Sequence, residues 1–249
     1  MMDSLKIATL LLLLSNFCFC AKLPSSFRKC DRNKKDFNQC LSKAVEDAVR
    51  QLTKPIKELG LPSMEPLEVP SLVIGAGSGA VAFEQNYQNT SVSGYGKMSC
   101  SKAEMNFETK TFYVHCTFPE VKMEFKYEIS GRILLLPIYG KGPGAITLER
   151  VETDLTFKLD EYDKKGVKYF KVANVTLVMD PQLIRFKLEN LFDGDEALGR
   201  NINSVLNDNW KEVFADVKPS YEDAFGKIYF SIFNNVLSKV PVNELFGDT

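Results

Sequence analysis

The feature that most constrains this chain is a long stretch near its C-terminus, from Asp195 to Lys239, in which apolar residues recur three and four positions apart. This spacing predicts a helix with one continuous apolar face, because residues three and four apart lie on the same side of an α-helix. Pro219 lies inside the stretch, and its ring disfavours helical geometry at Lys218, so we expect a kink or a break there. A helix of this length needs an equally long apolar cover.

The residues from Ser71 to Leu191 offer that cover. They alternate between apolar and polar and are rich in Val, Ile, Thr, Phe and Tyr, which is typical of strands with one buried and one solvated face. Asp163–Gly166 is typical of a hairpin turn between two long strands. The predicted strands are residues 80–87, 104–109, 112–118, 121–129, 133–138, 145–159, 167–179 and 183–188.

A first amphipathic helix is predicted from Phe37 to Leu52, with Asp36 placed to cap it and Pro55 close to its end. A linker rich in proline, Gly60 to Pro70, follows it. The order helix, meandering strands, helix predicts an α+β domain rather than a βαβ array. The natural packing is a curved antiparallel sheet that wraps the long C-terminal helix.

The composition is that of one globular domain. Of 249 residues, 45% are hydrophobic, which is enough for a sizeable core. The formal net charge is −1 and no Lys/Arg cluster is present, so the sequence offers no electrostatic surface for nucleic acid. We expect a single domain over residues 21–249.

The first 20 residues read as a secretory signal peptide. Lys6 is followed by the apolar run Ile7–Leu14, and Cys18 and Cys20 are small residues at positions −3 and −1 of a cleavage before Ala21. A membrane anchor is the alternative, but the run is far shorter than the ~20 apolar residues that span a bilayer. We therefore expect an extracellular protein without a transmembrane segment.

Four cysteines remain after the signal peptide, an even number suited to an oxidising compartment: Cys30, Cys40, Cys100 and Cys116. Three pairings are possible, and proximity in the sequence favours Cys30 with Cys40 and Cys100 with Cys116. A zinc site is the alternative, but there is no CxxC spacing and only one histidine, so we expect no metal. The sequons at Asn89 and Asn174 suit secretion as glycosylation sites.

Two motifs resemble catalytic or cofactor-binding machinery. Gly75–Ala80 matches a dinucleotide-binding pattern by letter, but the alternating residues after it predict a strand where that pattern needs a helix, so we interpret it as a bend between strands. His115 and Cys116 are adjacent in a predicted strand and therefore point to opposite faces. With no other catalytic signature, we expect neither an enzyme nor a cofactor.

The segment Gly131–Gly142 contains an apolar run, Ile133–Leu136, that interrupts the alternation. We interpret this run as a strand buried on both faces. Gly140, Gly142 and Gly144 then permit a sharp turn or a bulge. A phosphate-binding loop is the alternative, but neither a helix start nor a Lys-Ser/Thr pair follows.

The chain resembles the insect takeout and juvenile hormone binding protein family, in its takeout-like, circadian clock-controlled branch. The resemblance rests on the signal peptide, on Cys30 and Cys40 before the first helix, and on the segments Glu128–Gly142, Asn207–Phe214 and Phe225–Phe246. It implies secretion into haemolymph or another extracellular fluid and a long helix wrapped by a strongly curved antiparallel sheet, a super-roll like that of the BPI/TULIP proteins. It also implies an internal tunnel for a hydrophobic ligand. Cys30 and Cys40 match the family's N-terminal disulfide. For Cys100 and Cys116 our hypothesis is a disulfide across a hairpin near Thr109, and the alternative is that both thiols are free.

The candidate tunnel residues are apolar side chains of the C-terminal helix and of the buried run, each of which could equally be a core residue: Leu134, Leu136, Phe214, Phe225, Ile228, Ile232 and Phe233. Tyr127 and Tyr139 are candidates for a polar contact to the head of a ligand. We expect a monomeric carrier of juvenile hormone, another terpenoid, a fatty acid or a similar lipid, with the first helix as a gate. The alternative is a lipid-membrane or protein interaction module with a filled core.

Overall fold

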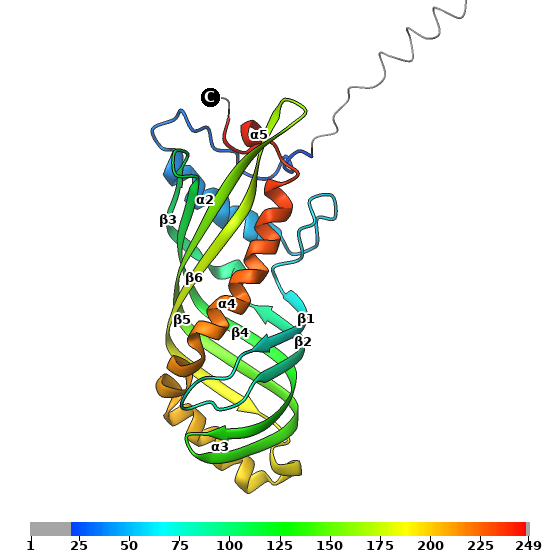
Figure 1. The fold of residues 1–249 in the computed structure, drawn as a ribbon, viewed down its shortest axis with the longest axis vertical. Coiled ribbons are helices and arrows are strands. Elements are labelled where there is room, and N and C mark those ends of the chain that lie inside the picture. Colours follow the sequence, from blue (N-terminus) through cyan, green and yellow to red (C-terminus); the bar gives the residue numbers. More distant parts are fainter. Residues whose placement is uncertain (1–20, 248–249) are drawn as a thin grey trace, which may run out of the picture.

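The computed structural model describes residues 21–247. The predicted signal peptide, residues 1–20, lies outside the described residues. The elements are α2 (Phe37–Gln51), β1 (Leu67–Ile74), β2 (Gln85–Ser93), η1 (Tyr95–Lys97), β3 (Ser99–Asn106), β4 (Thr111–Ile133), β5 (Leu136–Lys164), β6 (Val167–Leu188), η2 (Phe192–Gly194), α3 (Glu196–Asp208), α4 (Trp210–Leu237) and α5 (Val242–Phe246). In Figure 1 the long strands curl around α4, with α2 and α5 at one end of the molecule and α3 at the other. Between residues 21 and 247, no helix is long and apolar enough to cross a membrane.

The sheet is antiparallel and has the order β1-β2-β4-β5-β6, with β3 paired to β4 beyond the end of β2. The α+β prediction is therefore confirmed, as is the hairpin at Asp163–Gly166, where the N–H of Gly166 donates to Asp163 Oδ1 over 2.8 Å. The predicted strands were too short. Residues 112–118 and 121–129 belong to one strand, β4, whereas much of residues 80–87 forms a loop and β1 begins inside the predicted linker.

The three long strands, β4, β5 and β6, each bend at positions that are paired with one another. At the bend the alternation of buried and exposed residues shifts by one position, so the sequence pattern suggested that separate strands meet there. On β4 the buried positions are even-numbered up to Phe118 and odd-numbered from Met123 onward. The inward face also switches on β5 near Val151 and on β6 near Pro181. Phe118 pairs with Val151, and Val151 pairs with Pro181, so the three switches form one line across the sheet. A bend shared by neighbouring strands lets the sheet curl without losing its pairing.

Helices α3 and α4 cover the free edge of β6. Their side-chain oxygens accept hydrogen bonds from β6 backbone N–H groups: Asn203 from Leu188 (2.8 Å), Asn207 from Phe186 (2.7 Å), Glu222 from Met179 (3.0 Å) and Asn234 from Val172 (2.9 Å). An uncovered edge strand would offer these groups to another chain. The two helices therefore take the place of a further strand beside β6.

The glycine-rich loop after β1 fastens the opposite edge of the sheet to α4. The carboxylate of Asp216 accepts from the N–H groups of Ser78 (2.9 Å), Gly79 (3.0 Å) and Val81 (2.8 Å). A side chain at Gly77 would collide with this carboxylate, which explains a glycine there. The loop joins β1 to β2, as predicted, and its N–H groups bind the carboxylate of Asp216 and not the phosphate of a cofactor.

The break in the C-terminal helical stretch is at Asn209, between α3 and α4. Of the two outcomes predicted for Pro219, a kink or a break, the break does not occur there. Helix α4 continues through Pro219. Both Pro219 and Ala215, whose carbonyl loses its helical partner, are exposed, so water can replace the missing hydrogen bond.

The interpretation of Ile133–Leu136 as a strand buried on both faces was wrong. Leu134 and Leu135 have positive φ values of 51° and 84° and form the turn of the β4–β5 hairpin. Leu135 is 89% exposed and Leu136 is 41% exposed. The glycines that follow serve a different purpose, because a side chain at Gly142 would collide with the backbone of Glu189.

The first helix is confirmed at Phe37–Gln51, although the side chain of Asp36 makes no capping hydrogen bond. Both favoured disulfides are present, Cys30–Cys40 and Cys100–Cys116. The second joins directly paired residues of β3 and β4, so these thiols are not free. The two bridges fix the N-terminal arm to α2 and β3 to β4.

We predict that Asp216→Asn lowers the free energy of unfolding by about 1–3 kcal/mol, because an amide accepts fewer N–H bonds and turns its own NH₂ toward the loop. Burial alone would raise the pKa of Asp216, but hydrogen bonds from Val81, Ser78 and Gly79 lower it. The stabilisation is therefore present above the ordinary carboxyl pKa of about 4 and is lost as pH falls through the lowered folded value.

Denaturant unfolding at neutral and acidic pH measures this effect. The control is Asp223→Asn on the same helix, because Asp223 is 63% exposed and makes only a surface ion pair with Lys227. Equal losses in the two variants at neutral pH would contradict the role of Asp216.

Candidate functional site

Three apolar cavities lie between the sheet and α4. The outer cavity has a volume of about 290 Å³ and lies among the N-terminal arm, α2, the second half of α4 and the strands. The middle cavity, of about 80 Å³, is lined by the first half of α4 and by β4–β6. The inner cavity, of about 30 Å³, lies near the β4–β5 hairpin and includes Leu206 of α3. Ligand sites commonly have volumes of ~300–1,000 Å³, so the outer cavity alone approaches that range.

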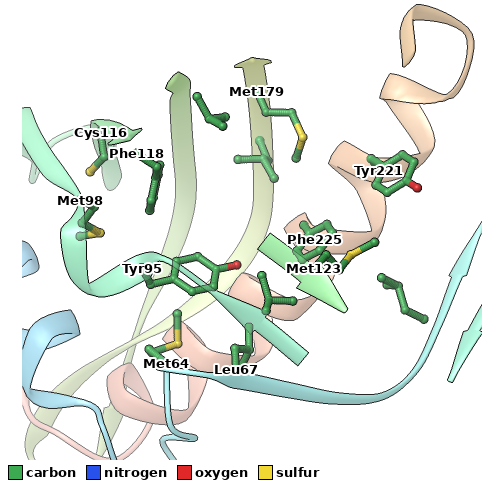
Figure 2. Close-up of a cluster of buried hydrophobic side chains, with 14 of the residues drawn as sticks. Met64, Leu67, Tyr95, Met98, Cys116, Phe118, Met123, Met179, Tyr221 and Phe225 are labelled. Carbon is green, nitrogen blue, oxygen red and sulfur yellow. The ribbon is translucent and has the colours of Figure 1, made fainter. Parts of the chain in front are cut away.

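The outer and middle cavities share five lining residues and are therefore neighbours: Tyr95, Phe118, Thr153, Leu177 and Tyr229. The hydroxyls of Tyr95 and Tyr229 lie 2.8 Å apart and bond to each other. Burial raises the pKa of Tyr229 to about 12 and that of Tyr95 well above its ordinary value, so both stay neutral. Figure 2 shows Tyr95 pointing into this interior, opposite Phe225 of α4.

The middle and inner cavities are separated by a second shared wall, which contains Gln85, Ile146, Phe186 and Val213. Gln85 is only 8% exposed. Its Oε1 accepts hydrogen bonds from the hydroxyls of Tyr87 (2.6 Å) and Tyr221 (3.2 Å), and these two hydroxyls lie 3.1 Å apart. This polar cluster is enclosed by apolar side chains, including Phe125, whose ring centroid lies 4.1 Å from that of Tyr87.

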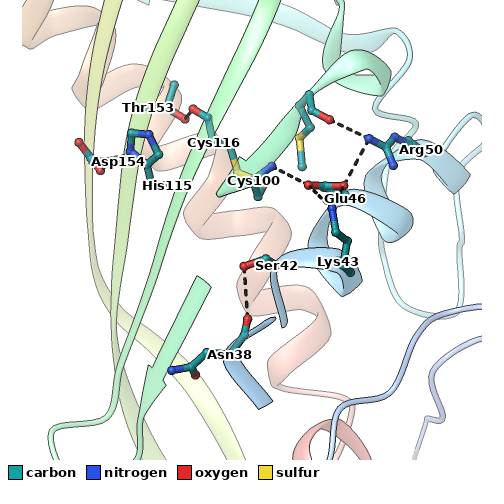
Figure 3. Close-up of a disulfide and its surroundings, with 11 residues drawn as sticks. Asn38, Ser42, Lys43, Glu46, Arg50, Cys100, His115, Cys116, Thr153 and Asp154 are labelled. Atoms are coloured by element: carbon teal, nitrogen blue, oxygen red, sulfur yellow. Dashed lines mark hydrogen bonds and ion pairs between the residues drawn. A yellow bond between two sulfur atoms is a disulfide. The ribbon is translucent and has the colours of Figure 1, made fainter. Parts of the chain in front are cut away.

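Helix α2 closes the outer cavity. The residues of its apolar side that line the cavity are Leu41, Ala44, Val45, Ala48, Val49 and, just beyond the helix, Leu52. A neighbouring side of α2 carries Glu46, which is 3% exposed and accepts from the N–H of Cys100 over 2.7 Å (Figure 3). Lys43 and Arg50 contact the same carboxylate at 3.3 and 3.4 Å. Arg50 also donates to the carbonyl of Met98, just before β3, over 3.0 Å, so polar contacts help to hold α2 to this part of the sheet.

The predicted site residues divide into three groups. Phe214 and Phe225 line the middle cavity, and Ile232 and Phe233 line the outer one. Ile228 packs against the core but lines none of the three cavities.

The second group consists of residues that the structure places away from the cavities. Leu134 and Leu136 lie at the hairpin turn, because the chain reverses where a buried strand was predicted. Tyr139 is 45% exposed and packs against Phe192 outside the cavities. The structure therefore removes these three residues from the candidate site.

Tyr127 is the third case. It lines the inner cavity, but its hydroxyl donates to the backbone carbonyl of Glu189 over 2.6 Å. Burial raises its pKa to about 12. The hydroxyl therefore already has a partner within the protein.

Sequence reasoning missed the residues of α2 and the polar cluster. Val81, Phe83, Gln85 and Tyr87 occupy alternate positions that all turn inward, and all four are buried. A glutamine among apolar residues of the inward-facing set was the available signal for the cluster. For α2 the signal was its apolar side, which was interpreted only as a gate.

The His115–Cys116 pair offers no thiol for catalysis. Cys116 is in a disulfide, and His115 Nδ1 lies 2.9 Å from Asp154 Oδ1, next to the hydroxyl of Tyr113, which bonds to the same carboxylate. Among residues 21–247, no group of three or more His, Cys, Asp or Glu side chains could hold a metal ion. The cavities, in contrast, can enclose an apolar molecule.

A curled sheet closed by one helix encloses apolar cavities of the kind that bind small hydrophobic molecules, and comparison with known proteins identifies the family. The model of the haemolymph juvenile hormone binding protein (JHBP) family matches residues 8–247. The chain belongs to this family, whose members bind and carry hydrophobic ligands and are binding proteins rather than enzymes.

Two relatives and one solved structure agree with this assignment. The circadian clock-controlled protein daywake of Drosophila yakuba is 24% identical over 231 residues, which cover 90% of this chain and 88% of that protein. Daywake of Drosophila melanogaster is 23% identical over the same shares of the two chains. The crystal structure of Takeout 1 from Epiphyas postvittana superposes with a TM-score of 0.77 at 24% identity, over 89% of this chain and 100% of that chain. The family resemblance and the expected fold are confirmed.

We predict that Glu46→Ala loosens α2, because the N–H of Cys100 and the charges of Lys43 and Arg50 lose their shared acceptor. The expected loss is roughly 2 kcal/mol of stability, with faster backbone hydrogen exchange concentrated in residues 37–51. Hydrogen exchange followed by mass spectrometry measures it.

Asp47→Ala is the matched control for Glu46→Ala. Asp47 is the next residue of the same helix and pairs with Arg28 at the surface. If both variants exchange equally fast, Glu46 does not hold the helix.

Proposed function

We propose that the protein is a secreted carrier that encloses one hydrophobic small molecule, such as juvenile hormone, another terpenoid, a fatty acid or a similar lipid. The observation that carries the proposal is the outer cavity, an apolar space of about 290 Å³ that the side chains leave open. Transfer of an apolar ligand from water into such a space is favourable by roughly 25 cal/mol per Å² of buried surface, so no charged partner is needed. The cargo occupies the outer cavity and extends into the middle one.

Several features support export of the protein as a glycoprotein, which we expect to be a monomer. The signal peptide at residues 1–20 would direct secretion. Two disulfides suit an oxidising compartment. Both sequon asparagines, Asn89 and Asn174, are exposed and accessible to a glycosylating enzyme.

The gate of this carrier is α2 together with the arm tied to it by Cys30–Cys40. The arm residues Leu23 and Phe27 and the apolar side of α2 form one wall of the outer cavity. Because their inner surface faces the ligand, α2 must move for a bulky molecule to enter from this end.

We predict that ligand addition slows hydrogen exchange over residues 36–60, since a bound molecule adds apolar contacts to the wall that has to open. Exchange followed by mass spectrometry with and without ligand tests this. The exposed β5–β6 hairpin at residues 163–167 is the internal control. Protection that is absent from residues 36–60 would place the entrance elsewhere.

We predict that Ile232→Trp weakens ligand binding by roughly tenfold or more, equivalent to about 1.4 kcal/mol. The larger ring occupies the outer cavity, so it competes with the ligand while stability changes by less than about 1.5 kcal/mol. Displacement of a fluorescent apolar probe and thermal unfolding measure the two effects.

Ile228→Trp is the matched control, one helical turn earlier on α4. Ile228 lines none of the three cavities described above, so overpacking there is expected to lower stability by about 1–3 kcal/mol and to leave the affinity of the folded protein unchanged. The alternative function, an interaction module without cargo, predicts that neither variant changes binding. Native mass spectrometry of protein purified from its own tissue, which should release a stoichiometric lipid from a carrier, separates the two functions.

A further inference from the structure

The wall between the middle and inner cavities contains a polar group that the carrier function does not by itself require. We propose that Gln85 recognises a neutral oxygen atom of the ligand, such as the carbonyl of an ester or ketone, through its side-chain NH₂ group. This inference rests on the proposed carrier function and adds the chemical class of the cargo.

The structure places Oε1 of Gln85 toward the hydroxyls of Tyr87 and Tyr221. Tyr87 and Tyr221 each have one hydroxyl hydrogen, and both hydroxyls lie within hydrogen-bond distance of Gln85 Oε1, at 2.6 and 3.2 Å. When both donate, the two acceptor positions of Oε1 are filled. The NH₂ group is then on the side of the amide that faces away from the tyrosines.

That NH₂ group is buried and has no hydrogen-bond partner in the protein. Gln85 is more than nine-tenths buried, and it lines both the middle and the inner cavity. A buried donor without a partner is costly, which is why nearly all such groups are paired. Because Gln85 is part of the cavity lining, an acceptor placed against it in the middle cavity would remove this cost.

The charge of the surroundings selects a neutral acceptor. The lining of the middle and inner cavities includes no Lys, Arg or His residue. The single cationic residue of the outer cavity, Arg28, has a side chain that is 50% exposed and paired with Asp47. Burial holds the pKa of Tyr87 and Tyr221 well above the ordinary range, so the cluster itself is neutral. A carboxylate placed at Gln85 would lose its hydration without gaining a counter-charge.

The experiment compares three probes of similar length: methyl dodecanoate, tetradecane and dodecanoic acid. Each displaces a fluorescent apolar probe from the full-length secreted protein at neutral pH. The variants are the wild type, Gln85→Leu and Gln88→Leu. The last is the matched control, because Gln88 is an exposed glutamine on the same strand whose side chain bonds to Ser71 at the surface.

We expect the wild type to bind the ester roughly fivefold to tenfold more tightly than the alkane, as one buried hydrogen bond implies. Dodecanoic acid should bind more weakly than the ester. Gln85→Leu should abolish the preference for the ester by weakening ester binding while alkane binding stays equal or improves. Gln88→Leu should behave as the wild type, and thermal unfolding verifies that both variants are folded.

The outcomes separate the inference from the function on which it rests. If no probe binds the wild type, the carrier function itself fails. If the ester and the alkane bind equally to the wild type, or if Gln85→Leu weakens both to the same extent, the carrier stands and the role of Gln85 is overturned, because an internal water would then satisfy the amide. Tightest binding by the acid would overturn the selection of a neutral oxygen.

Discussion

The structure depends on α4 closing a sheet whose two edge strands never meet. Glu222 and Asn234 bind backbone N–H groups of β6, and Asp216 holds the loop that leaves β1. Curling a sheet leaves two rows of unpaired backbone groups, which are costly to bury and hazardous to expose. Helix α4 satisfies part of the β6 row and binds N–H groups of the loop that follows β1, while it buries its apolar face. The polar side chains of this helix therefore contribute to its position as much as its apolar ones do. They hold it along the gap between the two edges of the sheet and not deep inside the curled sheet.

Periodicity was sufficient to predict the class of fold, since the helical pattern after Asp195 and the alternation before it each reflect one buried face. Periodicity failed where the chain changes direction without a glycine, a proline or another residue typical of turns. The turn at Leu134–Leu135 consists of leucines in a conformation that usually selects glycine or asparagine, so an apolar run concealed it. The strands predicted at 112–118 and 121–129 are one strand, and the gap between them contains Pro119, which lies at the line where three strands bend together, a feature that only the pairing of the strands reveals.

For the site, the sequence identified the helix that forms one wall but could not say which apolar residues face empty space. Phe225 and Ile228 are both apolar and three positions apart, yet of the two only Phe225 lines one of the three described cavities. The difference depends on how far the sheet stands from the helix at each level, which is a property of curvature and not of composition. The polar cluster could have been suspected from Gln85 in an inward-facing position. Its tyrosine partner on α4 lies 136 residues away, so its hydrogen bonds could not be predicted.

The decreasing size of the three cavities gives the proposed carrier a direction. Their volumes fall from about 290 to 80 to 30 Å³ between the α2 end and the hairpin end. The tyrosine pair Tyr95–Tyr229 stands at the first narrowing and Gln85 at the second. The two tyrosine hydroxyls at the first narrowing share one hydrogen bond, whereas the NH₂ group of Gln85 at the second narrowing has no hydrogen-bond partner at all. A ligand that enters beneath α2 would therefore lead with its oxygen-bearing end and leave its apolar remainder in the wide outer cavity, where the helix that admitted it closes over it.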